Sequence, residues 1–164
     1  MFKKLLLAIM IALPMSVFAQ KFAIINTQAL VESMPEIKTV QEQMEASNKK
    51  YQDEFDNLTA ELKKKYDEFQ ALDPNTLQTI KERRMTEIQE LEAKIQQFRE
   101  AAAQDLQRQN AQLMAPIQEK VIKAIQAVGQ EGAYTFVFEN NMPIYSGTDV
   151  TDITETVKAR LGVK

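Results

Sequence analysis

The sequence predicts a mainly α-helical protein, in which a long antiparallel helical hairpin stands on a small strand-rich root. Three observations predict this fold. No glycine occurs from residue 36 to residue 128. Apolar side chains in this stretch recur at helical spacing on both sides of one Asp-Pro turn. Short apolar runs that suit strands lie before and after it. The two distant ends of the chain should therefore meet at the base of the hairpin.

These features divide the chain into three parts. The expected parts are a signal peptide (1–19), a β-rich association root (20–35 and 129–164) and a helical hairpin (36–128) with its turn near 71–76.

The first nineteen residues have the layout of a secretory signal peptide, with basic Lys3 and Lys4, an apolar run and small residues before a cut. We expect cleavage after Ala19. A membrane anchor is the alternative, but the apolar run is shorter than the roughly 20 residues that cross a bilayer. The chain has no cysteine, so it forms no disulfide and carries no lipid on cysteine.

The first part of the root combines a strand and a short helix. The apolar run from Lys21 to Asn26 predicts the strand. Asn26 or Thr27 should then cap a helix from Gln28 to Met34.

The first arm helix should run from about residue 34 to residue 72. Ser33 and Glu36 have the spacing of a capping box, and Pro35 falls in the first turn. Downstream, the apolar residues form two heptad rows. These two rows form the seam that should face the other helix, and three positions in it are polar. The polar positions either let the arm flex or are ordinary imperfections of a solvated coiled coil. These positions are Gln41, Asn48 and Lys65.

The turn lies where the helical pattern stops and restarts. Asp73 caps the second helix there, or Pro74 takes position i+1 of a type I turn. The second helix should run from about 76 to 128 and reach roughly 75–80 Å. Its apolar period becomes eleven residues, which predicts a nearly straight helix with a local bend at Pro116. Because the turn is short, each helix should bury its apolar stripe against the other.

The second part of the root should contain two strands and a helix. Alternation over Tyr134–Phe138 predicts the first strand. Asn140-Asn141 predicts a tight turn, and Met142–Ser146 a returning strand that Pro143 restricts to an edge. A last amphipathic helix has apolar residues four apart and closes at Gly162.

A root of about three strands and two short helices is too small to bury its aromatic and branched side chains alone. Oligomerisation is the usual remedy without disulfides or metals, so we expect a homo-oligomer centred on Ile24, Phe136 and Phe138. The alternative is that these three side chains are buried in a core within each monomer. The residues expected at the oligomer interface are Phe22, Ile24, Tyr134, Phe136, Phe138 and Tyr145.

Composition excludes several functions. The chain has no histidine, cysteine or tryptophan, and its four glycines do not cluster. We therefore expect no cofactor, no metal site and no phosphate loop. Without Lys3 and Lys4, 18 basic residues face 23 acidic ones, so the net charge moves from −3 to −5, which disfavours nucleic-acid binding. Carboxylate pairs such as Asp53 and Asp56 should be solvated helix charges, so we expect no enzyme.

Basic residues flank the turn at similar heights on the two helices, roughly 15 Å from the tip. One interpretation is a collar that touches anionic lipid head groups or acidic segments of a partner protein. The other is a solvated, mixed-charge face, because Glu61, Glu82 and Glu87 lie close by. The candidate contact residues are Lys63, Lys64, Lys65, Lys81, Arg83 and Arg84.

Four segments set around the hairpin resemble Skp and the OmpH-like periplasmic chaperones. They are FAIINTQALVESMPE (22–36), AYTFVFE (133–139), IYS (144–146) and TDITETVKARLG (151–162). The resemblance covers the whole chain after the signal peptide, and the strand and TDIT ending behind the hairpin are its most specific part.

The resemblance implies a jellyfish-like homotrimer, in which strands of three subunits form a barrel and three hairpins surround a cavity as tentacles. It also implies an ATP-independent holdase in the periplasm. Such a protein encloses unfolded outer-membrane β-barrel proteins and keeps them soluble for delivery to the outer membrane. The alternative is an exported structural spacer or envelope scaffold, which would need the same helices but no cavity. Suppression of the aggregation of an unfolded β-barrel protein distinguishes the two.

Overall fold

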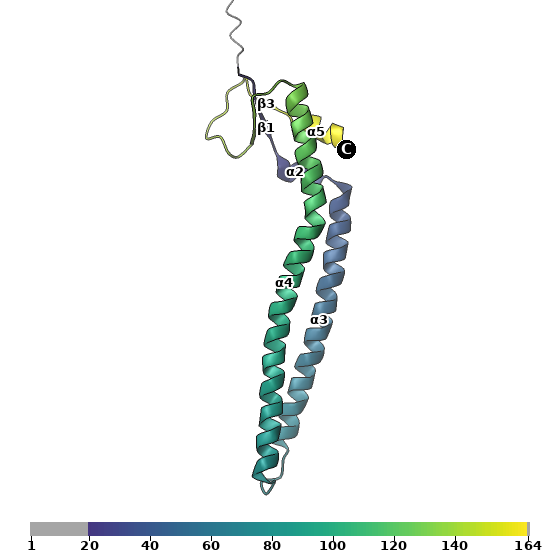
Figure 1. Ribbon diagram of the computed structural model, residues 1–164, viewed down its shortest axis with the longest axis vertical. Helices are drawn as coiled ribbons and strands as arrows, with labels where there is room; N and C mark the ends of the chain where they lie inside the picture. The colour runs from purple at the N-terminus through teal and green to yellow at the C-terminus, as the bar shows by residue number, and fades with distance from the viewer. Residues whose placement is uncertain (1–19, 164) are drawn as a thin grey trace, which may run out of the picture.

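The computed structural model describes residues 20–163, so the expected signal peptide and its cleavage site lie outside the described residues. The molecule is a long two-helix arm with a small α/β root at one end (Figure 1). Its elements are β1 (Phe22–Ile25), α2 (Thr27–Glu32), α3 (Pro35–Gln70), α4 (Gln78–Glu131), β2 (Phe136–Glu139), β3 (Thr151–Asp152) and α5 (Thr154–Leu161). The predicted fold class, mainly helical with a small sheet from both chain ends, is confirmed.

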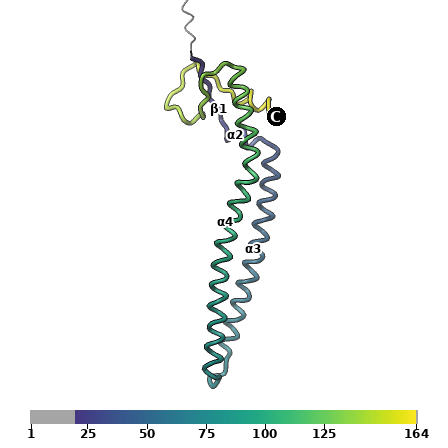
Figure 2. The backbone as a smooth tube through the Cα atoms, in the orientation of Figure 1, coloured from purple at the N-terminus to yellow at the C-terminus, as the bar shows by residue number. Residues whose placement is uncertain are grey.

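The arm consists of α3 and α4, which run antiparallel between the root and the tip (Figure 2). With 54 residues, α4 is roughly 80 Å long. It continues through Pro116 and ends three residues beyond the expected 128. Each helix turns one apolar stripe toward the other, and Leu58 and Leu91 are buried between them. No helix within residues 20–163 has an apolar stretch long enough to cross a bilayer.

The predicted capping box is wrong, whereas α2 is capped by Asn26, one of the two predicted caps. Ser33 ends α2 and does not begin α3, because only two residues separate these helices. Its hydroxyl donates to the Leu30 carbonyl oxygen at 2.7 Å. Met34 occupies the N-cap position of α3 without a side-chain hydrogen bond, and Pro35 is the first helical residue.

At the tip, Asp73 does not cap α4. Its carboxylate accepts a hydrogen bond from the Asn75 amide at 2.7 Å, and its carbonyl oxygen accepts one from the Thr76 amide at 2.9 Å. Pro74 therefore takes the second position of a four-residue turn, which is the other predicted alternative. Helix α4 begins after Leu77, which lies at its N-cap.

The sheet has three parallel strands in the order β2-β1-β3. The predicted returning strand at 142–146 is wrong, because this segment forms no strand and β3 supplies the third one. The expected turn is present, since the Met142 amide donates to the Glu139 carbonyl oxygen at 3.0 Å. Pro143 cannot donate to a strand pair, and the chain does not fold back onto β2. The parallel pairing of β1 and β2 is possible because the whole arm connects them.

One face of the sheet packs on the helices. Ala23 and Ile25 point to this side and are at most 2% exposed. Leu30 of α2 and Val157 of α5 are also fully buried there, so the two ends of the chain share one core. The core continues into the upper arm through Val40, Ile117, Val121, Ala124 and Val128. No described element covers the other face of the sheet.

Candidate association surface

The uncovered face of the sheet is apolar. Strand alternation turns Phe22 and Ile24 away from the core, and the parallel register sets Phe136 beside Phe22 and Phe138 beside Ile24. The three rings form one cluster, with centroids 5.8 to 6.4 Å apart. Phe136 is 56% exposed and Phe138 38%.

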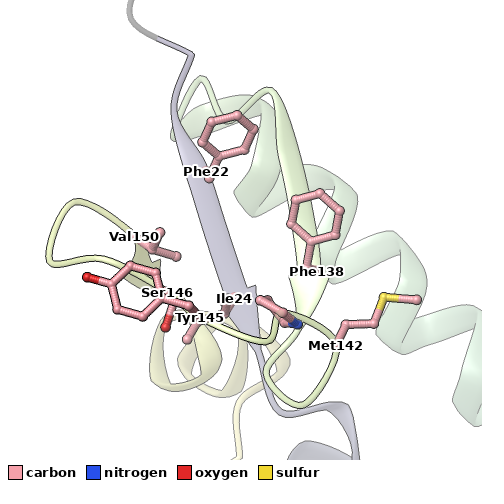
Figure 3. Close-up of a pocket in the computed structure, with 8 residues that line it drawn as sticks. Phe22, Ile24, Phe138, Met142, Tyr145, Ser146 and Val150 are labelled. Carbon is pink, nitrogen blue, oxygen red and sulfur yellow. The ribbon is translucent and has the colours of Figure 1, made fainter.

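The loop between β2 and β3 extends this surface. Met142, Ile144 and Tyr145 are exposed on the loop, Ile144 completely. Figure 3 shows Tyr145 and Met142 on either side of Ile24, with the rings of Phe22 and Phe138 above them. A hollow of about 440 Å³ lies among these side chains, and none of its lining residues is charged. We call the four sheet residues and the three loop residues together the apolar root face.

The apolar root face gathers exposed aromatic and aliphatic side chains in one place. Burying such side chains stabilises a protein by about 25 cal/mol per Å² of apolar area, and a single chain leaves this gain unused. A contiguous exposed apolar patch marks a surface that another molecule covers. The arrangement is therefore suited to association, and no charged residue lines its hollow.

Polar contacts at the carboxyl ends of the strands hold the root face in place. Glu139, at the end of β2, accepts hydrogen bonds from the Thr27 hydroxyl and, at 3.4 Å, from the Thr27 amide. The Thr154 hydroxyl accepts from the Asn26 amide at 2.9 Å and donates to the Asp152 carboxylate at 2.6 Å. Both ends of the chain are thus joined directly. In the sequence, the only signal of this network is a polar residue at the end of each strand, which was not among the predicted site residues.

The predicted interface residues are placed in two groups. Phe22, Ile24, Phe136, Phe138 and Tyr145 all lie on the apolar root face. Phe136 and Phe138 stay exposed in residues 20–163, which argues against the alternative that they form a core within the monomer.

Tyr134 is separate from this face. It packs against the buried core, and the Lys21 ammonium lies 4.3 Å from the centre of its ring. The strand begins only at Phe136, and Ala133 has a positive φ of 52°, so strand alternation does not extend back to Tyr134. Met142 and Ile144 were missed as site residues because their segment was interpreted as a strand.

The tip cations are largely paired with acidic residues of the same chain. Lys65 of α3 and Arg84 of α4 both lie 3.2 Å from a Glu87 carboxylate oxygen, and Arg83 lies 3.5 Å from the other. The Lys65 contact shows that the two clusters share one height on the arm. It is also the main cause that lowers the pKa of Glu87 below its usual value.

Of the other tip cations, Lys64 lies 3.9 Å from Glu68, and Lys81 donates to the Pro74 carbonyl oxygen at 2.8 Å. Lys63 forms no ion pair within residues 20–163. The proximity of acidic side chains thus agrees with the mixed-charge interpretation, while contact with an external anion stays a prediction.

The fold defines a class of protein, namely a two-helix arm carried by a small α/β root with one uncovered apolar face. The chain belongs to the OmpH-like family: the family model described as "Outer membrane protein (OmpH-like)" matches residues 21–161. This confirms the resemblance seen in the sequence.

Seven chains of solved structures match this protein. One is the crystal structure of a "putative outer membrane chaperone (OmpH-like)" from Caulobacter crescentus CB15. The match has a TM-score of 0.72 at 15% sequence identity and covers 87% of this chain and 83% of that chain. At this identity the likeness concerns the fold. No match is found among the curated proteins.

Proposed function

We propose that this protein is an ATP-independent holdase chaperone of the periplasm. It encloses unfolded outer-membrane β-barrel proteins and keeps them soluble until they reach the outer membrane. Membership of the OmpH-like family and the fold shared with the Caulobacter protein support a chaperone role. The expected signal peptide supports export.

The observation that carries the proposal is the apolar root face at one end of a long arm. Three copies joined through Phe22, Phe136 and Phe138 would cover these rings and direct three arms to the same side. Since α4 is roughly 80 Å long, such a homotrimer would surround a space large enough for an unfolded chain. Covering the root faces also supplies the burial that a root of this size lacks.

The arm is suited to weak and adaptable contacts. Its two helices bury one stripe against each other, so most of the remaining surface is polar and available to a client. Many weak contacts can hold an unfolded chain and still release it by exchange, without nucleotide hydrolysis. Asn48 borders an unfilled space between the two helices, and such a gap in the seam would let the arms adapt to clients of different size.

Suppression of aggregation tests this function. An unfolded outer-membrane β-barrel protein is diluted from urea with or without the residue 20–164 protein, and light scattering is followed. We expect scattering to fall in proportion to the added trimer, without ATP. Sedimentation equilibrium of the same sample should give the mass of three chains. Undiminished scattering at an excess of protein would exclude the holdase and favour a structural spacer.

A further inference from the structure

A second hollow, of about 540 Å³, lies halfway along the arm between α3 and α4. It exists because large and small side chains meet across the helix pair. The rings of Tyr51 and Phe98 lie 6.0 Å apart, and Ala102 and Ala103 beside them leave the space unfilled. The volume falls within the range of about 300–1,000 Å³ that is usual for small-ligand sites. We call this site the mid-arm hollow.

The aromatic wall of the mid-arm hollow is fixed. The Tyr51 hydroxyl donates to the Asp105 carboxylate at 2.6 Å, which ties the ring of α3 to α4. The same carboxylate also accepts hydrogen bonds from Arg108 and Gln109. Asp105 is therefore fully engaged, and the ring of Tyr51 needs no reordering to receive a ligand.

Arg99 supplies the only charge among the residues that line the hollow. Its guanidinium lies 5.9 Å from the centre of the Phe55 ring. Arg99 forms no ion pair with a carboxylate in the described part of the chain, residues 20–163, whereas Arg83, Arg84, Arg108 and Arg160 all do. An aromatic hollow with an uncompensated cation at its rim is complementary to a ligand that is both aromatic and anionic.

We propose that the mid-arm hollow is a client subsite, which takes an aromatic side chain of an unfolded segment together with a neighbouring carboxylate. The incoming ring contacts Tyr51, Phe55 and Phe98, which favour offset or edge-to-face contacts. The carboxylate pairs with the planar Arg99 guanidinium. The Asn48 carboxamide, also in the lining, can donate to and accept from the main chain of the segment. This inference rests on the proposed function, because it names the client feature that the arm recognises.

A fluorescent peptide provides a direct test. The chain contains no tryptophan, so the indole emission of a short Gly-Trp-Asp-Gly peptide reports on the peptide alone. The comparison peptide carries Asn in place of Asp. For the residue 20–164 protein at low salt, we expect the Asp peptide to bind about threefold more tightly than the Asn peptide, the size of effect usual for an exposed ion pair.

Two variants test the two halves of the site. Arg99→Gln should remove the preference for the Asp peptide, so that the two peptides bind equally tightly. Ala103→Leu should fill the hollow and reduce the binding of both peptides by at least tenfold. The matched controls are Lys94→Gln and Ala101→Leu, exposed residues of the same helix that do not line the hollow. Both controls should bind like the unchanged protein, and circular dichroism should show equal helicity in all four variants.

Binding that survives Ala103→Leu, or a preference for Asp that survives Arg99→Gln, would overturn the proposal. A change of oligomer mass in Ala103→Leu with unchanged peptide binding would also overturn it, since the hollow would then be a contact between copies of this chain. Aggregation suppression is measured in parallel. Suppression without peptide discrimination rejects the subsite alone, and discrimination without suppression rejects the holdase function and with it the client assignment.

Discussion

Truncation of Phe136 tests whether the apolar root face joins the subunits. The side chain is 56% exposed in the single chain, where its ring also contacts those of Phe22 and Phe138. An aromatic side chain offers about 200 Å² of accessible area, which leaves roughly 100 Å² for a partner to cover. At about 25 cal/mol per Å², and after allowing for the remaining methyl group, each subunit loses about 2 kcal/mol of association free energy.

In a trimer, three such losses amount to about 6 kcal/mol, or on the order of 10⁴ in the dissociation constant. The concentration at half dissociation varies with the square root of a monomer–trimer constant, so it should rise on the order of 100-fold. Sedimentation equilibrium over a wide concentration range measures this shift. The thermal midpoint of the unchanged protein should also rise with concentration, because folding and assembly are linked.

Ile122→Ala is the matched control. Ile122 is 53% exposed but lies on α4 beside α2 and not on the apolar root face, so its truncation should leave the half-dissociation concentration within a few-fold of the original. Equal shifts for the two variants, or no shift for either, would refute the assignment of the root face as the association surface.

Three further predictions concern the core and the tip. Leu30→Ala should destabilise the protein by about 2–5 kcal/mol in urea unfolding, because Leu30 is fully buried in the shared core, and a loss below about 1 kcal/mol would contradict this packing. The Lys65 hydrogen bond lowers the pKa of Glu87 below its ordinary 4.5, so the stabilising effect of Glu87 should be present above that pH and disappear as the pH falls through the lowered value. Amide-exchange protection at the tip should therefore differ between Glu87→Gln and the unchanged protein near neutral pH and converge once the pH falls below the lowered pKa of Glu87, and a constant difference would argue against the ion pairs. Replacing four paired tip cations with Gln should slow client capture only slightly at low salt, because their charges are already partly compensated, whereas a large loss that vanishes at high salt would indicate contact with an external anion. These four are Lys64, Lys65, Arg83 and Arg84.

The sequence alone predicted the features that depend on local interactions. Helical spacing and the absence of glycine over 36–128 were sufficient to predict the two helices of the arm, because each helix turn depends on neighbouring residues. The cap at Asn26 and the left-handed Gly162 at the end of α5 were found for the same reason. A local signal gave a wrong prediction at Ser33. This residue ends α2 and therefore cannot also cap the start of α3.

The association surface could be predicted only in part. Alternation in strands shows that Phe22 and Ile24 share one face and that Ala23 and Ile25 share the other. It cannot show which face the helices cover, because that depends on how α4 and α5 dock. Tyr134 was misplaced because its backbone leaves the strand geometry on which the alternation depends.

By itself, the sequence determined a long helical arm, a root made from both chain ends and an excess of apolar side chains in that root. Only the tertiary structure decided that the sheet is parallel, with β1 at its centre, and that β3 and not 142–146 completes it. Strand pairing joins residues more than a hundred positions apart, and the information that selects the partner lies in the shape of the whole core. Once Ala23 and Ile25 are buried against the helices, Phe22, Ile24, Phe136 and Phe138 lie on the opposite face of the sheet, which no helix within residues 20–163 covers.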